Sequence, residues 1–196
     1  MPRPKQRTPE LRDRVLQVAV STLNQDGLSG LTTRRVAERA GTSVPAVYEF
    51  FGDKSGLLRA VFFEGFRMLR RQLIAVPETD DALADVQRLI PVFRRFCLDY
   101  PALARVMFSR PFQDFNPGPE ELAASPSVRE IFVGRIKRCT DAGLLSGDPV
   151  DIAHVLLALA QGLAVQEGGR WLGKSKASVN RRWEVGVTGI LRGFSR

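Results

Sequence analysis

The sequence of 196 residues contains a single histidine, and its only cysteines are Cys97 and Cys139. The two cysteines lie far apart in segments with helical patterning, so we expect buried free thiols and a reducing compartment. One histidine leaves no metal cluster and no Ser-His-Asp set. No phosphate-binding loop or dinucleotide fingerprint occurs either. We therefore expect no enzymatic activity, no metal and no cofactor.

Long hydrophobic runs are also missing. The most apolar stretch, IAHVLLALAQGLAV at 152–165, is interrupted by His154 and Gln161 and is short for a membrane span. No apolar segment follows the basic start MPRPKQR, so no secretory signal peptide is expected. These absences predict a cytoplasmic protein without a membrane partner.

Positive charge is abundant, with a net charge of +8 and a pI of about 10.3. This balance favours an anionic partner such as nucleic acid. Residues 1–56 carry nine Lys or Arg against six Asp or Glu, and the remaining residues carry twenty against fifteen. Because the excess is not confined to one end, charge alone does not locate the binding surface.

Helical periodicity covers most of the chain, and no segment has the alternation of a strand. The first helix should start at the cap Thr8 and end at Gly27, with a loop after it. Thr32, Ser43 and Asp53 are suitable caps for the next three helices. Later helices are expected near 79–99, 102–109, up to 141, 149–168 and 176–193, and 119–124 could begin another. The sequence therefore predicts an all-α fold of about nine helices.

Two short helices separated by Gly41 form a helix-turn-helix pattern, with a longer supporting helix before them. Five residues should form its packed face: Val36, Ala37, Ala40, Val47 and Phe51. The remaining face of the second short helix should be solvent-exposed: Val44, Pro45, Ala46, Tyr48 and Glu49. A pair of packed helices without DNA is the alternative interpretation.

Residues 30–62, GLTTRRVAERAGTSVPAVYEFFGDKSGLLRAVF, resemble the tetracycline-repressor (TetR) family of one-component transcriptional regulators. The stretch contains the T-x-R-x-V-A-x-x-A-G element, a capping Ser43, the aromatic pair Tyr48 and Phe51, and Lys54 before a Leu-Leu helix. The resemblance covers the N-terminal third, from about Thr8 to Phe62.

The resemblance implies DNA-binding roles for nine residues. Thr33 and Arg34 would reach the phosphate backbone and a base edge, and Arg is the natural partner of guanine. Tyr48 and Lys54 would hold phosphates, and the basic arm at 3–7 could add contacts. The implied DNA-binding residues also include Ser43, Val44, Pro45, Ala46 and Glu49, of which Val44, Pro45 and Ala46 match positions presented to the major groove. Because Val44, Pro45 and Ala46 are apolar, specificity should depend on Arg34, thymine methyl contacts and DNA shape. Glu49 could accept a hydrogen bond from the amino group of cytosine or pair with Arg34 or Arg35.

The family architecture implies a DNA-binding domain at 1–54 and a helical effector-binding and dimerisation domain at 55–196. A homodimer would form through the last two helices, at Leu156, Ala160, Leu163, Trp183, Val187 and Ile190. The alternative is that these helices pack only inside one subunit. The middle helices would surround an effector pocket, with these candidate residues: Phe62, Phe66, Phe93, Phe96, Phe108, Phe112, Phe132, His154 and Gln161. Any of the phenylalanines could instead be ordinary core.

Together these features predict a transcriptional regulator, most simply a repressor. A homodimer would bind a palindromic double-stranded DNA operator and be released by a small apolar or aromatic effector. A helical protein that sequesters a ligand or partner without binding DNA is the alternative.

Overall fold

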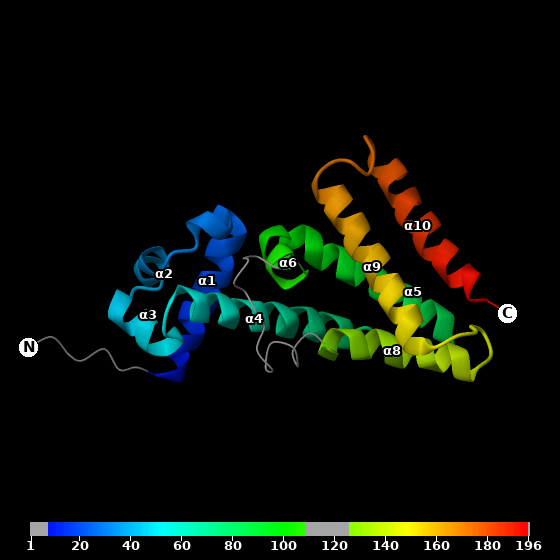
Figure 1. The fold of residues 1–196 in the computed structure, drawn as a ribbon, viewed down its shortest axis with the longest axis horizontal. Helices are drawn as coiled ribbons and strands as arrows, with labels where there is room; N and C mark the ends of the chain where they lie inside the picture. The colour runs from blue at the N-terminus through cyan, green and yellow to red at the C-terminus, as the bar shows by residue number, and fades with distance from the viewer. Residues whose placement is uncertain (1–7, 109–125, 196) are drawn as a thin grey trace, which may run out of the picture. The chain divides into compact units, whose positions relative to one another are not determined.

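The computed structural model describes residues 8–108 and 126–195 (Figure 1). These residues form an all-α fold, as expected, with a single isolated bridge between Leu145 and Ser195. The segment 119–124 and Phe112 lie outside the described residues. The helices are α1 (Pro9–Gly30), α2 (Thr33–Arg39), α3 (Val44–Phe51), α4 (Lys54–Ile74), α5 (Ala82–Asp99), α6 (Pro101–Phe108), α8 (Pro126–Asp141), α9 (Pro149–Gly168) and α10 (Lys176–Gly193).

The four expected N-terminal caps are confirmed. Thr8, Thr32 and Ser43 each accept a hydrogen bond from the backbone N–H three residues later. The Asp53 carboxylate accepts from the N–H of Gly56 at 2.7 Å. These bonds satisfy N–H groups that the first turn of a helix leaves without a partner, so each helix begins where the sequence provides a cap.

The predicted end of α1 at Gly27 is only partly correct. Gly27 has φ +70°, a left-handed conformation that glycine adopts readily, and it kinks the chain. Helical structure resumes after this residue and continues to Gly30, where a loop was expected. The extra turn places Leu31 in a fully buried position before α2 begins.

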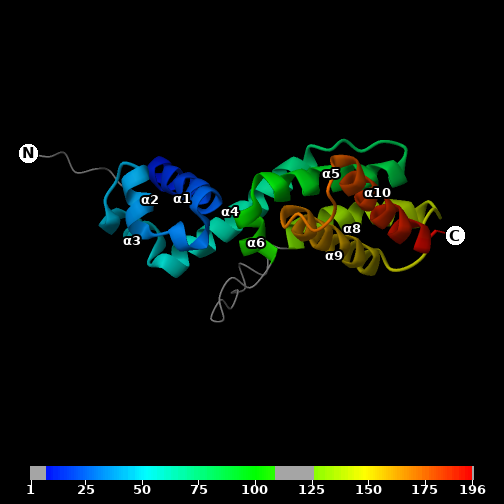
Figure 2. The same ribbon diagram turned by 90° about the horizontal axis from the view of Figure 1, so that it is seen from above.

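The chain divides into two compact units. The first contains α1, α2, α3, α4 up to Gly65, and α6 from Ala102. The second contains α4 from Phe66 onward, α5, α8, α9 and α10 (Figure 2). The expected boundary after residue 54 differs from this division, since α4 contributes residues to both units.

A buried carboxylate connects three elements of the second unit. Asp85 of α5 is fully buried and accepts from the backbone N–H and the hydroxyl of Thr79, both at 2.8 Å. Arg138 of α8 donates to the same carboxylate at 2.6 Å, and Arg88 also bonds to it. Arg135, 6% exposed, lies 3.5 Å from it. Burial of this charge is therefore compensated by several donors.

The two arginines of α8 also bind the connection between α4 and α5. Arg135 donates to the carbonyl oxygens of Val76 at 2.6 Å and Pro77 at 3.1 Å. Arg138 donates to the carbonyl of Thr79. This Asp85 cluster thus fixes the loop after α4 to α8.

The Asp85 cluster predicts acid sensitivity. The backbone N–H of Thr79 contributes most to holding the pKa of Asp85 well below its ordinary value, and Arg138 adds to this against the opposing effect of burial. The unfolded chain therefore takes up this proton at a higher pH than the native chain. The resulting stabilisation is complete above about pH 4 and is lost as the pH falls further.

We expect Asp85→Asn to lower the thermal midpoint by roughly 10 °C at pH 7 and to flatten its decline below about pH 4. Thermal unfolding followed by circular dichroism measures both. Asp141→Asn is the control, since Asp141 forms an exposed pair with Lys137. Equal effects of the two substitutions would contradict this role of Asp85.

Candidate functional site

The short helices α2 and α3 meet through a small apolar core. Gly41 has φ +63° and makes the turn between them. The expected packed residues are all buried, at 8% exposure or less: Val36, Ala37, Ala40, Val47 and Phe51. The guanidinium of Arg12 lies 5.2 Å from the centre of the Phe51 ring, which attaches α3 to α1. The helix-turn-helix geometry expected from the sequence is therefore present.

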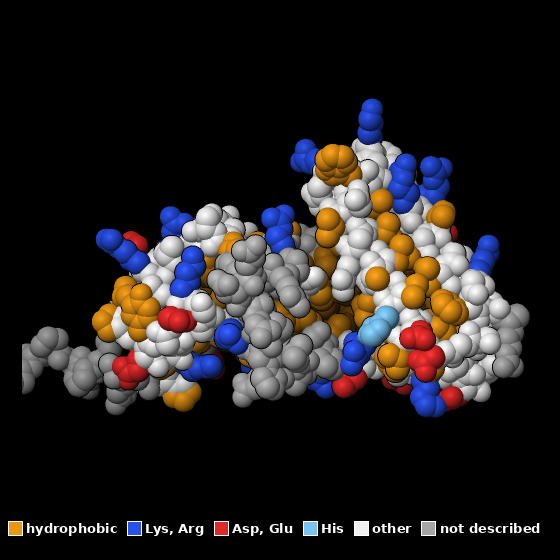
Figure 3. All heavy atoms as spheres, in the orientation of Figure 1, with side chains coloured by type: hydrophobic (Ala, Val, Ile, Leu, Met, Phe, Trp, Pro, Cys, Tyr) orange, Lys and Arg blue, Asp and Glu red, His pale blue; other side chains and the backbone are white. Residues whose placement is uncertain are grey.

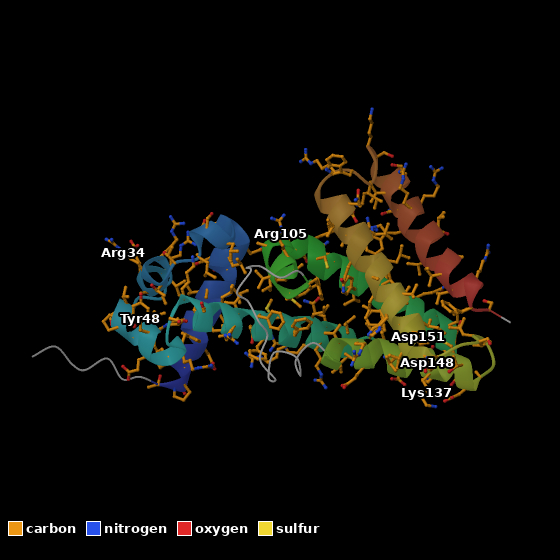
Figure 4. The ribbon with its side chains drawn as sticks, in the orientation of Figure 1. Arg34, Tyr48, Arg105, Lys137, Asp148 and Asp151 are labelled. Atoms are coloured by element: carbon orange, nitrogen blue, oxygen red, sulfur yellow. The ribbon has the colours of Figure 1, made fainter. Side chains whose placement is uncertain are left out.

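The other side of this pair presents polar groups to solvent. Arg34 of α2 and Tyr48 of α3 are exposed and come from neighbouring helices (Figure 4). The Thr33 hydroxyl donates to the Tyr48 hydroxyl at 3.3 Å, so these two candidates are brought together. The other exposed candidates are Ser43, Pro45, Glu49 and Lys54, and Val44 is half-buried.

The expectation that Ala46 faces solvent is wrong, because it is only 8% exposed. Ala46 precedes the fully buried Val47 by one position and lies at the edge of the packed face. Its single methyl group is small enough to be covered by its neighbours. The apolar groove-facing set is therefore reduced to Val44 and Pro45.

An ion-pair network that sequence reasoning missed distinguishes Arg34 from the neighbouring arginines. Asp26 of α1 pairs with Arg35 at 3.2 Å and with Arg39 at 3.0 Å. Arg39 also donates to the hydroxyl of Thr22 at 3.1 Å. Arg34 has no such ion pair within the part of the chain that the structure describes, so its guanidinium is available to a ligand.

The turn from α3 into α4 requires a glycine. A Cβ atom at Gly56 would lie 1.8 Å from the carbonyl oxygen of Phe51. Since no real Cβ atom approaches that closely, the absence of a side chain lets α4 start immediately after α3. This turn places Lys54 near the end of α3.

In the rest of the chain, the phenylalanines predicted to line a pocket form core contacts. Phe62, Phe66, Phe93, Phe96 and Phe132 are buried, and Phe108 is half-buried. The rings of Phe93 and Phe132 meet edge to face at 6.5 Å. Of the two polar pocket candidates, His154 is exposed on α9 and Gln161 is half-buried.

A groove of about 900 Å³ lies between α5 and α10 in the second unit. Ile90, Leu98, Trp183 and Val187 give it an apolar lining, and Arg94 reaches into its wall. The sequence patterns did not reveal this groove, because its two walls lie far apart along the chain.

Arg94 organises the wall of the groove. It donates to both carboxylate oxygens of Glu167, at 2.7 and 2.6 Å, and to the side-chain oxygen of Asn180 at 2.9 Å. Its guanidinium lies 5.2 Å from the Trp183 ring, and the indole N–H donates to Glu167 at 2.8 Å. Burial raises the pKa of Glu167, but the hydrogen bonds from Arg94 and Trp183 together lower it by more. The pKa of Glu167 is therefore below its ordinary value.

Reactive or metal-binding groups are not evident in the described residues. Both cysteines are buried free thiols, as expected, and burial raises the pKa of Cys97 to about 12. Within residues 8–108 and 126–195, no three His, Cys, Asp or Glu side chains are grouped as metal ligands would be. The exposed polar surface of α2 and α3 is therefore the strongest candidate for function.

Comparison with known families agrees with this assignment. Residues 15–61 match the model for bacterial regulatory proteins of the tetR family, and residues 86–190 match the tetracycline repressor-like C-terminal domain. The chain belongs to the TetR family. The first match contains the whole α2–α3 surface, and the resemblance drawn from residues 30–62 is confirmed.

Individual relatives support the same family. The class C tetracycline repressor of Escherichia coli is 36% identical over 150 residues, which are 76% of this chain and 61% of that repressor. The chain thus spans less than two thirds of the length of this relative. A Rhodococcus sp. RHA1 protein of unknown function has a TM-score of 0.83 at 27% identity, over 99% of this chain and 100% of the other. ActR of Streptomyces coelicolor, solved with (S)-DNPA, shares the fold at a TM-score of 0.65 and 21% identity, over 93% and 95% of the two chains.

Most residues expected at a dimer interface point into their own subunit. Leu156, Ala160, Trp183 and Val187 are buried within the single chain, while Leu163 and Ile190 are half-buried. Trp183 is buried because it packs on Arg94 and bonds to Glu167. Their helical spacing marks an apolar face correctly, but this face packs within the TetR-family subunit.

A second face of α9 and α10 remains uncovered. Val155, Val165 and Val185 are 42%, 73% and 65% exposed. Figure 3 shows hydrophobic side chains spread over these two helices on the face turned toward the viewer. We call this surface the outer face; it contains Val155, Ala158, Gly162 and Val165 of α9, and Val185 and Gly189 of α10.

The apolar residues of the outer face add to those of the packed side and make α9 apolar as a whole. By length and composition alone, α9 is the one described helix long and apolar enough to cross a membrane. Its other side packs against α5, α8 and α10, as a core helix does. Apolar residues on two sides of one helix account for its mean hydropathy.

We expect Gly56→Ala to destabilise the protein by about 1–3 kcal/mol, because the new methyl group collides with the Phe51 carbonyl and displaces α3 from α4. Urea unfolding measures the change. Gly134→Ala is a matched control, since a Cβ there meets no described atom within 4 Å. A smaller loss at Gly56 than at Gly134 would contradict the steric requirement.

Proposed function

We propose that this TetR-family protein is a transcriptional repressor that binds a palindromic operator as a homodimer and leaves it when a small apolar or aromatic effector binds. The observation that carries the proposal is the exposed surface of α2 and α3, where Arg34 and the Thr33–Tyr48 pair stand above a buried core. The availability of Arg34 and Lys54 favours operator binding over a role limited to sequestering a ligand.

Each side chain of this surface suits a different part of DNA. The Tyr48 and Thr33 hydroxyls and the Lys54 ammonium group can bind phosphates, which fixes the position of the protein without reading sequence. Arg34 can bond to guanine N7 and O6 in the major groove. Val44 and Pro45 can only contact thymine methyl groups, so most hydrogen-bonded specificity should come from Arg34.

A homodimer supplies the second reading surface. The outer face of α9 and α10 leaves apolar side chains exposed to water, and a second copy of the chain can cover them. Two copies related by a two-fold axis would present their α3 helices to successive major grooves, about 34–36 Å apart.

An effector would act by binding more tightly to one arrangement of the two α2–α3 surfaces in the dimer than to the other. The groove beside Arg94 and Trp183 in the second unit has an apolar and aromatic lining that suits an apolar or aromatic molecule. The complex of ActR with (S)-DNPA is a small-molecule complex of the same fold. Release from DNA requires that the effector bind the two arrangements with different affinity.

Gel-shift titration with the promoter DNA beside the protein's own gene tests this proposal, first without and then with candidate effectors. Specific retardation that a candidate effector reverses is the expected result. Absence of binding beyond that of an unrelated duplex at the same salt concentration would overturn the proposal.

Arg34→Ala should weaken operator binding by about 1–3 kcal/mol and relax the preference at one base pair in each half-site. Tyr48→Phe should weaken binding to all sequences alike, because a phosphate contact carries no sequence information. Fluorescence anisotropy with operator and mutated-operator duplexes distinguishes the two patterns. Arg181→Ala, on the exposed side of α10, should leave both affinities unchanged.

A further inference from the structure

The connection between α9 and α10 carries only positive charge. Residues 168–182, GGRWLGKSKASVNRR, contain five Lys or Arg and no Asp or Glu. Four of these cations are exposed around the connection: Arg170, Lys174, Lys176 and Arg182. Figure 3 shows basic side chains gathered where α9 and α10 are joined, around an exposed hydrophobic group. We call these four cations together with Trp171 the basic tip.

The four cations have no carboxylate partner among the described residues. Arg182 donates to the carbonyl of Ser178 at 3.2 Å. Its guanidinium also lies against the connection, because a Cβ atom at Gly173 would be 2.7 Å from its Nη1. Glu167, the carboxylate that precedes the connection, is already bound in the wall of the groove. The tip therefore keeps its positive charge, and a negatively charged partner is the natural complement.

Trp171 is 83% exposed, although its position is well defined. The N–H groups of Trp171 and Leu172 both donate to the carbonyl of Gln166, at 2.8 and 3.2 Å, and Leu172 is buried. A Cβ atom at Gly169 would lie 2.7 Å from Cδ1 of the indole, so the ring lies against the end of α9 where glycine leaves room. The tip thus presents an apolar ring to solvent directly beside its cations.

Arg170 occupies a position that favours glycine. Its φ is +60°, the only positive φ of a non-glycine residue in the described part of the chain. Helices commonly end with a glycine in this left-handed conformation, and a residue with a side chain is strained there. Gly168 and Gly169 immediately precede Arg170, yet neither occupies the left-handed position. A strained arginine directly before an exposed tryptophan points to a role other than folding.

We propose that the basic tip binds the surface of a membrane that contains anionic phospholipids. Lys and Arg side chains attract anionic head groups, and tryptophan favours the boundary between head groups and acyl chains. The binding is peripheral. The expectation of no membrane partner came from the lack of a spanning run, which peripheral binding does not need.

Nucleic acid is the other polyanion that this charge would attract. Proteins that bind single strands stack successive bases on several aromatic rings, whereas the tip has one ring. Contacts to the phosphates of a duplex need cations but no exposed indole. A membrane accounts for both the cations and Trp171, so it is the partner that the observations favour.

Sedimentation of the whole protein with lipid vesicles tests the proposal. We expect binding to equimolar phosphatidylcholine and phosphatidylglycerol that weakens as salt is raised, and little binding to phosphatidylcholine alone. Lys174→Gln should weaken the binding about fivefold, and Lys174→Gln/Lys176→Gln about 25-fold. Lys137→Gln is the matched control. It removes a cation from α8 instead and should leave vesicle binding unchanged.

Trp171→Ala tests the apolar contact without a change of charge, with an expected weakening of about tenfold. The fluorescence of the parent protein should shift to shorter wavelength when anionic vesicles are added. Trp171 is the source of this shift, because the other tryptophan, Trp183, is already buried. Trp171→Phe should abolish the shift.

Arg170→Gly separates vesicle binding from folding. Glycine relieves the strain of the left-handed conformation, so the thermal midpoint measured by circular dichroism should equal or exceed that of the parent protein. Vesicle binding should nevertheless weaken about fivefold, because one cation is lost. A lower midpoint with unchanged vesicle binding would show that Arg170 serves the fold and would count against the proposal.

Equal binding to neutral and anionic vesicles, or equal binding by Lys137→Gln and Lys174→Gln, would overturn the proposal. If the tip variants lose affinity for an unrelated DNA duplex but not for vesicles, the tip binds nucleic acid and the membrane proposal fails. Operator binding measured by gel shift should be the same in the tip variants and the parent protein. Failure at the membrane is therefore distinguishable from failure of the proposed function.

Discussion

The buried carboxylate of Asp85 is the interaction on which the second unit depends. It joins α5 to two arginines of α8, and the same arginines bind the carbonyl groups that follow α4. A single charge without water must have several donors, so these elements can only be rearranged together. The carbonyl groups bound by Arg135 and Arg138 belong to the segment that directly follows α4.

The first unit satisfies a different constraint. The two-turn helix α3 must pack on one side and leave its other side exposed to solvent. Val47 and Phe51 anchor α3, while Tyr48 stays exposed and bonds to Thr33. Asp26 pairs with Arg35 and Arg39, whereas Arg34 has no ion pair among the described residues. In the proposed function, specific recognition of DNA would therefore depend on few side chains, with apolar contacts at Val44 and Pro45.

The last two helices show why burial and assembly are hard to separate from sequence. Both α9 and α10 carry apolar residues on more than one side. The side with Leu156, Ala160 and Trp183 packs within the subunit, and the side with Val155, Val165 and Val185 does not. Periodicity detects both sides, but only the position of α5 and α8 decides which is covered. Four of the six residues expected at a dimer interface are therefore buried within the single chain.

The sequence by itself determined the helices, their caps and the TetR-family surface, because these depend on interactions within a few residues. Thr32, Ser43 and Asp53 mark helix starts through bonds that span three positions. Only the tertiary structure decided that Ala46 is buried, that His154 is exposed, and that Arg94 and Trp183 line a groove. These facts depend on contacts between residues far apart in the chain, such as Arg94 and Glu167, and no local pattern specifies which distant side chains will meet.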